Sequence, residues 1–182
     1  MEQTYSFKNM LIKKIIGIIL ILFALFSFLS LFYNNPSDPG FGFSGSKQSI
    51  KNLMGIGGAY YSSFLLIILG YSSYVVSLFF LTHGLIVVFT NSKKYTSIKF
   101  LFLFMGVCLC NLLITLFNVK FSLLGTVLSD FAMPYINNYF YSNTSYWFLV
   151  FVLSILSLFF HLSAFSIKIK KCLFLVKKVL PS

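Results

Sequence analysis

The stretch IIGIILILFALFSFLSLF, residues 15–32, runs for eighteen residues without a charged side chain. As an α-helix it would rise about 27 Å, close to the roughly 30 Å hydrocarbon core of a bilayer. We therefore predict a first membrane span at about 15–33. A cleaved signal peptide is the alternative, with Gly42 and Ser44 as small residues for the cleavage site. These residues lie well beyond the apolar run, which is also long for a signal peptide.

The composition of the whole chain agrees with a lipid environment. Hydrophobic residues make up 58% of the 182 residues, charged residues only 9%, and the mean hydropathy is +0.91. A soluble domain carries about 25% charged residues. Because a span and its connection use more than about 20 residues, four or five spans at most fit this length. We predict an all-α membrane protein without a soluble domain.

Three further apolar runs predict spans at about 64–89, 100–118 and 146–165. Together the four runs define a membrane domain at 15–165, between an N-terminal segment at 1–14 and a basic tail at 166–182. The predicted connections are outer loops at 34–63 and 119–145 and a cytoplasmic loop at 90–99. Tyr146 and Trp147 open the last span, as expected of an interfacial aromatic belt.

The second outer loop contains an amphipathic pattern, FSLLGTVLSDFAMPYI, residues 121–136. At helical spacing, one face carries apolar side chains and another carries mainly polar ones. The apolar face comprises Leu124, Val127, Leu128, Phe131 and Tyr135, and the second face comprises Ser122, Thr126, Ser129, Asp130 and Met133. This pattern predicts a helix that lies in the membrane interface before the last span.

The lysines predict the orientation. The chain has fourteen Lys, no Arg and three acidic residues, for a net charge of +11. If both termini lie on one side, that side holds eleven lysines and the other side holds only Lys47, Lys51 and Lys120. The positive-inside rule then places both termini and the loop 90–99 in the cytoplasm. Because the lysines flank apolar runs, topology and anionic lipid explain them, and we expect no direct nucleic-acid binding.

Few side chains of the chain are candidates for catalysis, proton transfer or metal binding. His83, His161 and Asp130 fall within or beside the predicted spans, but near their ends, where interfacial residues are a better explanation than a proton relay. Cys108 and Cys110 would lie about 200° apart on one helix and cannot pair. Cys172 stands alone among lysines. We predict no catalytic site, no metal site, no cofactor and no enzymatic activity for this chain.

The string GIGG, residues 55–58, is not a phosphate-binding loop, because the chain contains no Gly-Lys dipeptide. Two interpretations remain. The small residues let the second span or its lead-in approach a neighbouring helix closely, or the segment is a flexible loop. The residues concerned are Gly55, Gly58, Ala59, Ser62 and Ser63.

The stretch YNNPSDPGFGFSG, residues 33–45, directly follows the first span. Pro36 and Pro39 fix φ at two positions, and the side chains of Ser37 and Asp38 are suited to cap free backbone amides. The pattern predicts a rigid turn, or the start of a short helix, at the membrane surface.

This turn and the glycine-rich segment after it resemble the four-span amino-terminal domain of the FtsK/SpoIIIE family of bacterial DNA translocases. The resemblance covers about residues 14–165, although Asn34 adds a residue to the turn and only Gly125 remains of a glycine motif before the last span. The matching residues are Tyr33, Asn35, Pro36, Ser37, Asp38 and Pro39, then Asn52, Gly55, Gly58, Ala59 and Tyr60, then Gly70, Ser73, Tyr74 and Gly125.

The resemblance implies a membrane anchor that tethers a chromosome-segregation motor at the division septum of the bacterial cytoplasmic membrane. It implies a homo-oligomer that contacts other division proteins. The sequence contains no Walker A motor, so we expect a truncated or split-gene product or an isolated domain, with an FtsK-type motor in trans. Pro36, Asp38 and Pro39 are then expected to fix how the outer loop leaves the membrane.

Two other functions fit a four-span chain. A disulfide-forming oxidoreductase needs cysteine pairs in the outer loops, where this sequence has none. A small transporter is the second alternative, and it would be expected to have broken helices with polar groups near the middle of the membrane.

Overall fold

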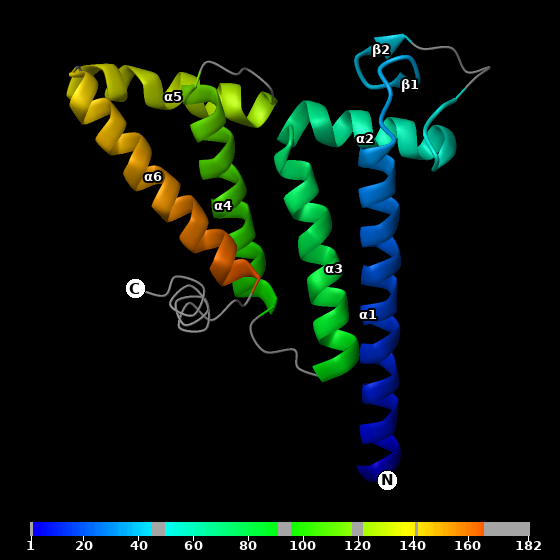
Figure 1. Cartoon of the computed structure of the whole chain (residues 1–182). Coiled ribbons are helices and arrows are strands. Elements are labelled where there is room, and N and C mark those ends of the chain that lie inside the picture. The colour runs from blue at the N-terminus through cyan, green and yellow to red at the C-terminus, as the bar shows by residue number, and fades with distance from the viewer. Residues whose placement is uncertain (1, 45–49, 91–95, 118–121, 141, 166–182) are drawn as a thin grey trace, which may run out of the picture.

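A computed structural model of the chain describes residues 2–44, 50–90, 96–117, 122–140 and 142–165. Over these residues it contains six helices and one short hairpin (Figure 1). The hairpin pairs Pro39 with Ser44 and Gly40 with Phe43 in antiparallel register. The elements in chain order are α1 (Glu2–Phe32), β1 (Pro39–Gly40), β2 (Phe43–Ser44), α2 (Gly55–Leu69), α3 (Ser72–Thr90), α4 (Thr96–Leu116), α5 (Leu123–Tyr139) and α6 (Asn143–Ala164).

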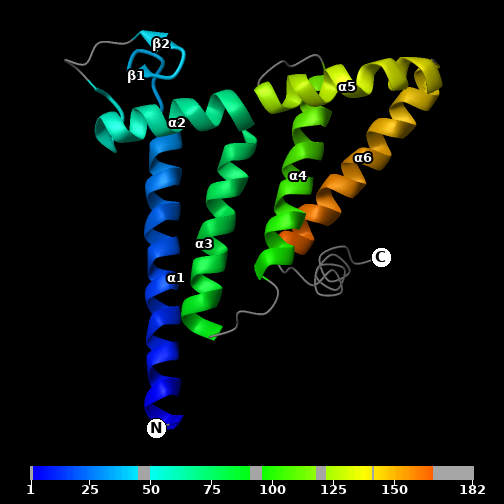
Figure 2. The ribbon, with the colours of Figure 1, turned by 180° about the vertical axis from the view of Figure 1, so that it is seen from behind.

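Four of the helices are long and apolar enough to cross a membrane. The qualifying segments are Phe7–Phe32, Ser72–Phe89, Ile98–Leu116 and Asn143–Ala164. In both ribbon views α2 and α5 lie across the same end of these four helices (Figures 1 and 2). We call this end, which also carries the hairpin, the capped end, and the opposite one the N-terminal end. The predicted all-α membrane fold with four spans and a crosswise helix before the last span is confirmed.

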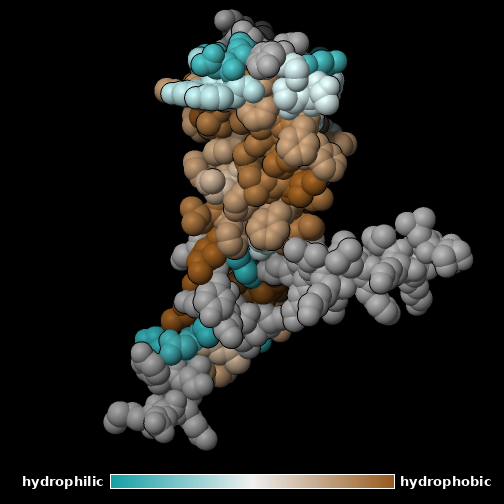
Figure 3. Space-filling view, turned by 90° about the vertical axis from the view of Figure 1, so that its left-hand side faces the viewer, coloured by the Kyte–Doolittle hydropathy of each residue, from teal (hydrophilic) through white to brown (hydrophobic). Residues whose placement is uncertain are grey.

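The outer surface of the helices is apolar. Figure 3 shows a band of hydrophobic side chains between hydrophilic groups at the capped end and toward the N-terminal end. On α6, for example, Phe148, Phe151 and Leu158 are each at least 60% exposed. Soluble proteins rarely leave so extensive an apolar surface open, whereas in a bilayer it faces hydrocarbon.

The second predicted span, 64–89, is wrong at its start, because residues 64–69 belong to α2 and only α3 crosses. Gly70 forms the corner with φ +56° and ψ −141°, a conformation almost restricted to glycine. Its N–H donates to the Leu66 carbonyl, and its carbonyl accepts from the Ser73 hydroxyl at 2.7 Å. The corner is thus hydrogen-bonded on both sides, and the predicted outer loop 34–63 contains most of a helix.

The first helix is longer than its predicted span. α1 begins at Glu2 and continues through the segment 1–14, because no proline or glycine interrupts residues 2–14. Lys8, Lys13 and Lys14 therefore lie on the helix that also forms the first span.

Both halves of the chain repeat one arrangement, in which a span is followed by a crosswise helix and a returning span. In the first half α1 packs on α3, where the carbonyl of Gly84 lies 3.0 Å from the position that a Gly17 Cβ would take. In the second half α4 packs on α6, where Gly106 makes room for the His161 ring. A cluster of Phe79, Leu103, Val107 and Ala164 joins the halves.

The contact face of α5 differs from both predicted faces. Its buried residues are Gly125, Ser129 and Ile136, while Phe131 and Asp130 are exposed. The small residues let α5 approach α4 closely, and the apolar and polar side chains flank this contact.

We predict that Gly84→Ala destabilises the α1–α3 pair by about 1–3 kcal/mol, the usual cost of overpacking. A Cβ there would lie 2.7 Å from Ile21 Cγ1 and 2.9 Å from the Gly17 carbonyl oxygen. Gly57→Ala in α2 is the matched control, because a Cβ at Gly57 meets no atom within 4 Å. Thermal unfolding in detergent, followed by circular dichroism, measures both. Equal midpoints for the two variants would contradict the close contact.

Candidate functional site

The candidate site lies at the capped end, where the chain leaves α1, forms the hairpin and enters α2 (Figure 1). Most residues of the predicted motif gather here. We call the group formed by Ser30, the turn 35–39, Asn52 and Gly58 the turn clamp.

The turn itself is closed by short-range hydrogen bonds. The Asn35 side-chain oxygen accepts from the N–H of Ser37 at 2.9 Å, and the Asn35 carbonyl accepts from the N–H of Asp38 at 3.0 Å. Asn is suited to this position because its side chain imitates a backbone acceptor. Pro36 restricts φ between them. The segment is therefore the predicted rigid turn rather than a short helix.

Asp38 carries the central interaction of the clamp. Its carboxylate is 2% exposed, and its two oxygens accept from the N–H groups of Lys51 and Asn52, each at 2.8 Å. Hydrogen bonds to an ionised acceptor are roughly twice as strong as neutral ones. One side chain thus holds two chain segments together that are thirteen residues apart in sequence.

The Asn52 side chain links the turn to the end of α1 and to the start of α2 by hydrogen bonds. Its side-chain N–H donates to the Ser30 carbonyl at 2.8 Å, and its side-chain oxygen accepts from the N–H of Met54 at 3.0 Å. The Ser30 carbonyl belongs to the last turn of α1, where carbonyls have no partner within the helix. A Cβ on Gly58 would lie 2.5 Å from the Asn52 side-chain oxygen, so only glycine fits beside it.

The hairpin rests on α2 through one serine. The Ser63 hydroxyl accepts from the N–H of Phe41 at 2.9 Å, and it also lies where a Cβ on Gly40 would stand. One turn earlier on α2, Ala59 is buried. The rings of Phe41 and Tyr60 meet edge to face at 5.7 Å. Of the small residues named for close approach, Gly58, Ala59, Ser62 and Ser63 are buried, as that interpretation predicts, whereas a Cβ on Gly55 would meet no atom within 4 Å.

Two tyrosines tie α2 and α3 to α1. The Tyr61 hydroxyl donates to Ser27 Oγ at 2.9 Å, and the Tyr74 hydroxyl donates to the Leu31 carbonyl at 2.9 Å. Burial raises the pKa of the Tyr61 phenol above its usual value, and the hydrogen bond to Ser27 opposes this only in part. Tyr61 therefore remains a neutral hydrogen-bond donor at physiological pH.

A second polar group links the two halves of the molecule. Asn111 is 2% exposed, its N–H donates to Ser72 Oγ at 3.0 Å, and its side-chain oxygen accepts from Ser122 Oγ at 2.6 Å. Ser72 begins α3, and Ser122 caps α5 by accepting from the N–H of Gly125. A single side chain on α4 thus fastens the start of two other helices.

The structure brings only part of the predicted motif together. Asn35, Asp38, Asn52 and Gly58 form the clamp, with Pro39 buried at the start of β1 and with Pro36 and Ser37 exposed. The other motif residues lie around it or apart from it. Gly55 begins α2, Ala59 is buried in α2, Tyr60 is partly exposed, Gly70 forms the corner, Tyr74 bonds α1, and Gly125 lies beside Asn111 in the other half.

Sequence reasoning missed Ser30 and Asn111, and it named Ser63 only as a small packing residue and Ser122 only as part of a polar face. Asn111 was visible as the one amide side chain within residues 100–117, and an amide in an apolar run is a signal of a buried polar contact in a span. The serines carry no such signal, because serine is common in membrane helices and bonds its own backbone there.

The residues considered for chemistry do not assemble into a catalytic group. His83 and His161 each bond a carbonyl of their own helix, and Asp130 is exposed on α5. Cys108 and Cys110 are unpaired thiols, and Cys172 lies outside the described residues. Within the described ranges, no group of three or more His, Cys, Asp or Glu is placed to hold a metal ion.

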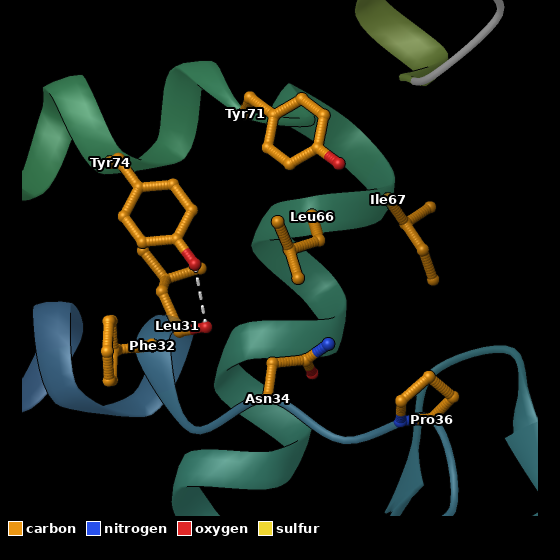
Figure 4. Close-up of a pocket in the computed structure, with 8 residues that line it drawn as sticks. All are labelled: Leu31, Phe32, Asn34, Pro36, Leu66, Ile67, Tyr71 and Tyr74. Atoms are coloured by element: carbon orange, nitrogen blue, oxygen red, sulfur yellow. Dashed lines mark hydrogen bonds between the residues drawn. The ribbon is translucent and has the colours of Figure 1, made fainter.

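A cavity of about 430 Å³ opens beside the clamp (Figure 4). It is lined by the end of α1, the turn, the end of α2 and the start of α3. The lining residues are Leu31, Phe32, Asn34, Pro36, Leu66, Ile67, Tyr71 and Tyr74.

Comparison with known protein families places the chain. The model of a protein family described as the 4TM region of DNA translocase FtsK/SpoIIIE matches residues 9–172. No curated protein and no solved structure matches the chain. The matched range contains the first span from residue 9 onward, the other three spans in full, both crosswise helices and the turn clamp.

We predict that Asp38→Ala opens the connection between α1 and α2, because it leaves the buried N–H of Asn52 and the partly buried N–H of Lys51 without acceptors. Such groups cost about 1–3 kcal/mol each. The readout is the rate of trypsin cleavage after Lys51, whose N–H the Asp38 carboxylate holds. Cleavage should accelerate in Asp38→Ala and stay unchanged in Asp130→Ala, which removes an exposed acid from α5. Wild-type cleavage in Asp38→Ala would show that the carboxylate does not hold the segment.

Proposed function

The chain belongs to the family of the four-transmembrane region of FtsK/SpoIIIE DNA translocases, and we propose that it anchors such a translocase in the bacterial cytoplasmic membrane at the division septum. The observation that carries the proposal is the family match over residues 9–172, which includes three of the described spans in full and the first from residue 9 onward. The matched region is a membrane region and not a motor domain, so the proposed role is tethering.

The proposed orientation has both termini in the cytoplasm. Among the described residues, Lys8, Lys13, Lys14 and Lys99 lie on the parts of α1 and α4 toward the N-terminal end, whereas Lys51 lies at the capped end (Figure 1). Asp38 and Asp130 also lie at the capped end. This distribution supports a cytoplasmic N-terminal end under the positive-inside rule.

The crosswise helices suit an anchor that is loaded from the cytoplasm. A motor that pulls on DNA also pulls on its tether, and the load acts to draw the anchor toward the cytoplasm. α2 and α5 lie across the capped end. Pulling the anchor toward the cytoplasm would therefore move the turn clamp with Asp38, and the exposed Asp130, into the hydrocarbon core. Moving charged groups into the bilayer core costs at least about 2.5–3.5 kcal/mol each.

The proposed partners are further copies of the chain, other division proteins and an FtsK-type motor, acting in trans where it is encoded separately. The exposed apolar sides of α1, α4 and α6 provide the surface for lateral contacts within the membrane. The lysines of the segment 166–182 follow the last span in the sequence and would lie near the motor and anionic lipid.

We predict that a cysteine at position 37 is accessible from outside the cell and one at position 8 is not. The experiment uses Ser37→Cys and Lys8→Cys in a chain whose native cysteines are replaced by serine, because both positions are exposed. A membrane-impermeant maleimide should label Ser37→Cys in intact cells and Lys8→Cys only after permeabilisation. The reverse pattern would contradict the orientation without affecting family membership.

We predict that the full chain, fused at one terminus to a fluorescent protein, concentrates at the division septum and co-purifies with a translocase motor. The double variant Asp38→Ala, Pro39→Ala should lose septal enrichment if the turn clamp shapes the outer surface that division proteins contact. Asp130→Ala is the matched control. Uniform membrane fluorescence of the wild-type chain would contradict septal tethering.

A further inference from the structure

Two hollows lie along one face of the α1–α3 pair, and we call the face that contains both of them the groove. The upper hollow is the cavity of about 430 Å³ at the capped end. The lower hollow has about 230 Å³ and lies deeper along the same two helices. Its lining residues are Ala24, Leu25, Phe28, Ser77, Leu78 and Leu81.

The spacing of the lining residues shows that the hollows lie on one face. On α1, Leu25 of the lower hollow and Phe32 of the upper one are seven residues apart, as are Ala24 and Leu31. Seven residues make about two helical turns, or roughly 10.5 Å, and return the side chain to the same face.

The same spacing holds on α3, and an aromatic side chain lies between the two hollows. Leu81 and Tyr74 are seven residues apart on α3, in the opposite chain direction. Between the hollows, the Phe28 ring stacks on Phe32 at 6.2 Å and meets Tyr74 edge to face at 6.1 Å. The hollows therefore lie at successive depths on the same face of the α1–α3 pair, with the Phe28 ring between them.

The polarity of the groove changes with depth. The lower hollow is apolar except for Ser77, whose hydroxyl is hydrogen-bonded to Ser27 Oγ at 2.6 Å. The upper hollow adds the Asn34 amide and two tyrosines at the level where α1 ends and α3 begins. Aromatic side chains in membrane proteins gather at this level, among the lipid headgroups. No residue lining either hollow is charged.

We propose that this groove binds one phospholipid of the leaflet at the capped end, with an acyl chain in the lower hollow and the glycerol-ester region in the upper hollow. Asn34 is the polar contact. Its side-chain oxygen accepts from Ser62 Oγ at 3.0 Å, and Figure 4 shows its nitrogen directed toward the cavity side, between Leu66 and Pro36. An amide N–H suits an ester carbonyl, and the absence of charge from the lining gives the phosphate no partner.

The size of the groove favours a lipid chain over a protein helix. A helix with its side chains is about 10–12 Å across. A hollow of about 230 Å³ is too narrow for it but accommodates a single alkyl chain. The lining changes from polar in the upper hollow to apolar in the lower hollow over two helical turns. A lipid changes in the same order, from its polar ester region to its apolar acyl chain.

The test uses the full chain in vesicles of phosphatidylethanolamine and phosphatidylglycerol, each carrying in turn a photoactivatable group midway along one acyl chain. We expect adducts on residues 25–32 of α1 and 74–81 of α3. Leu78→Trp fills the lower hollow and should lower the yield there about tenfold, which corresponds to roughly 1.4 kcal/mol. Leu158→Trp on α6 is the matched control, because it makes the same change at an exposed position outside the groove.

Three results would overturn the proposal. Adducts spread evenly over the lipid-facing surfaces of α1 and α6 would indicate ordinary solvation by lipid. Equal yields in wild type and Leu78→Trp would do the same. A strong preference for one of the two headgroups would contradict recognition through the uncharged ester region. If Leu78→Trp does not fold, Leu25→Trp fills the hollow from α1.

A protein occupant would give a different outcome. In that case Leu78→Trp would change self-association of the chain, measured by cross-linking in the same vesicles, and leave lipid adducts in the groove unchanged. That result also counts against the proposal. None of these outcomes depends on septal localisation, so they leave the proposed anchoring role unaffected.

Discussion

The buried carboxylate of Asp38 is the interaction on which the capped end depends. Between α1 and α2 the chain runs for 22 residues, 33–54, and a connection of this length has no fixed course of its own. The carboxylate gives it one, because two backbone N–H groups bind it and the Asp38 side chain is buried. Asn52 is thereby held against the end of α1, and Gly58 must follow it closely. The position of α2, and with it the upper hollow of the groove, follows from these contacts.

Within the membrane, the helices are held together by small and polar residues rather than by apolar burial. Lipid tails are as apolar as leucine, so burying leucine between two spans adds little driving force. Close approach at Gly17 and Gly84 and the Ser27–Ser77 hydrogen bond take its place between α1 and α3. Asn111 performs the same task between the halves. The large apolar side chains, in contrast, lie mostly on the surface.

The sequence was sufficient to predict the spans and the turn. It was insufficient to predict where a helix changes direction and which distant residues a side chain contacts. Hydropathy located four spans because each needs about 20 apolar residues, and α5 was predicted from its amphipathic period. The corner at Gly70 was missed because residues 65–69 are as apolar as a span, and hydropathy carries no information on where a helix turns. Besides their local hydrogen bonds, Asp38, Asn52 and Asn111 bond partners that lie between 11 and 39 residues away in sequence. No local pattern specifies such contacts, although the turn residues themselves were recognisable.

The different packing of the two halves follows from the lengths of their connections. The 22 residues after α1 let α2 begin beyond α1, cross over its end and deliver α3 beside it (Figures 1 and 2). Only six residues, 117–122, separate α4 from α5, so α5 has to begin close to the end of α4. A helix of 17 residues is about 26 Å long, and α6 therefore descends from a point far from α4 and leans back to meet it at Gly106. Leu116, Ile136 and Val150 pack together in the corner between α4, α5 and α6. With a longer connection before α5, the start of α6 would not have to lie so far from α4.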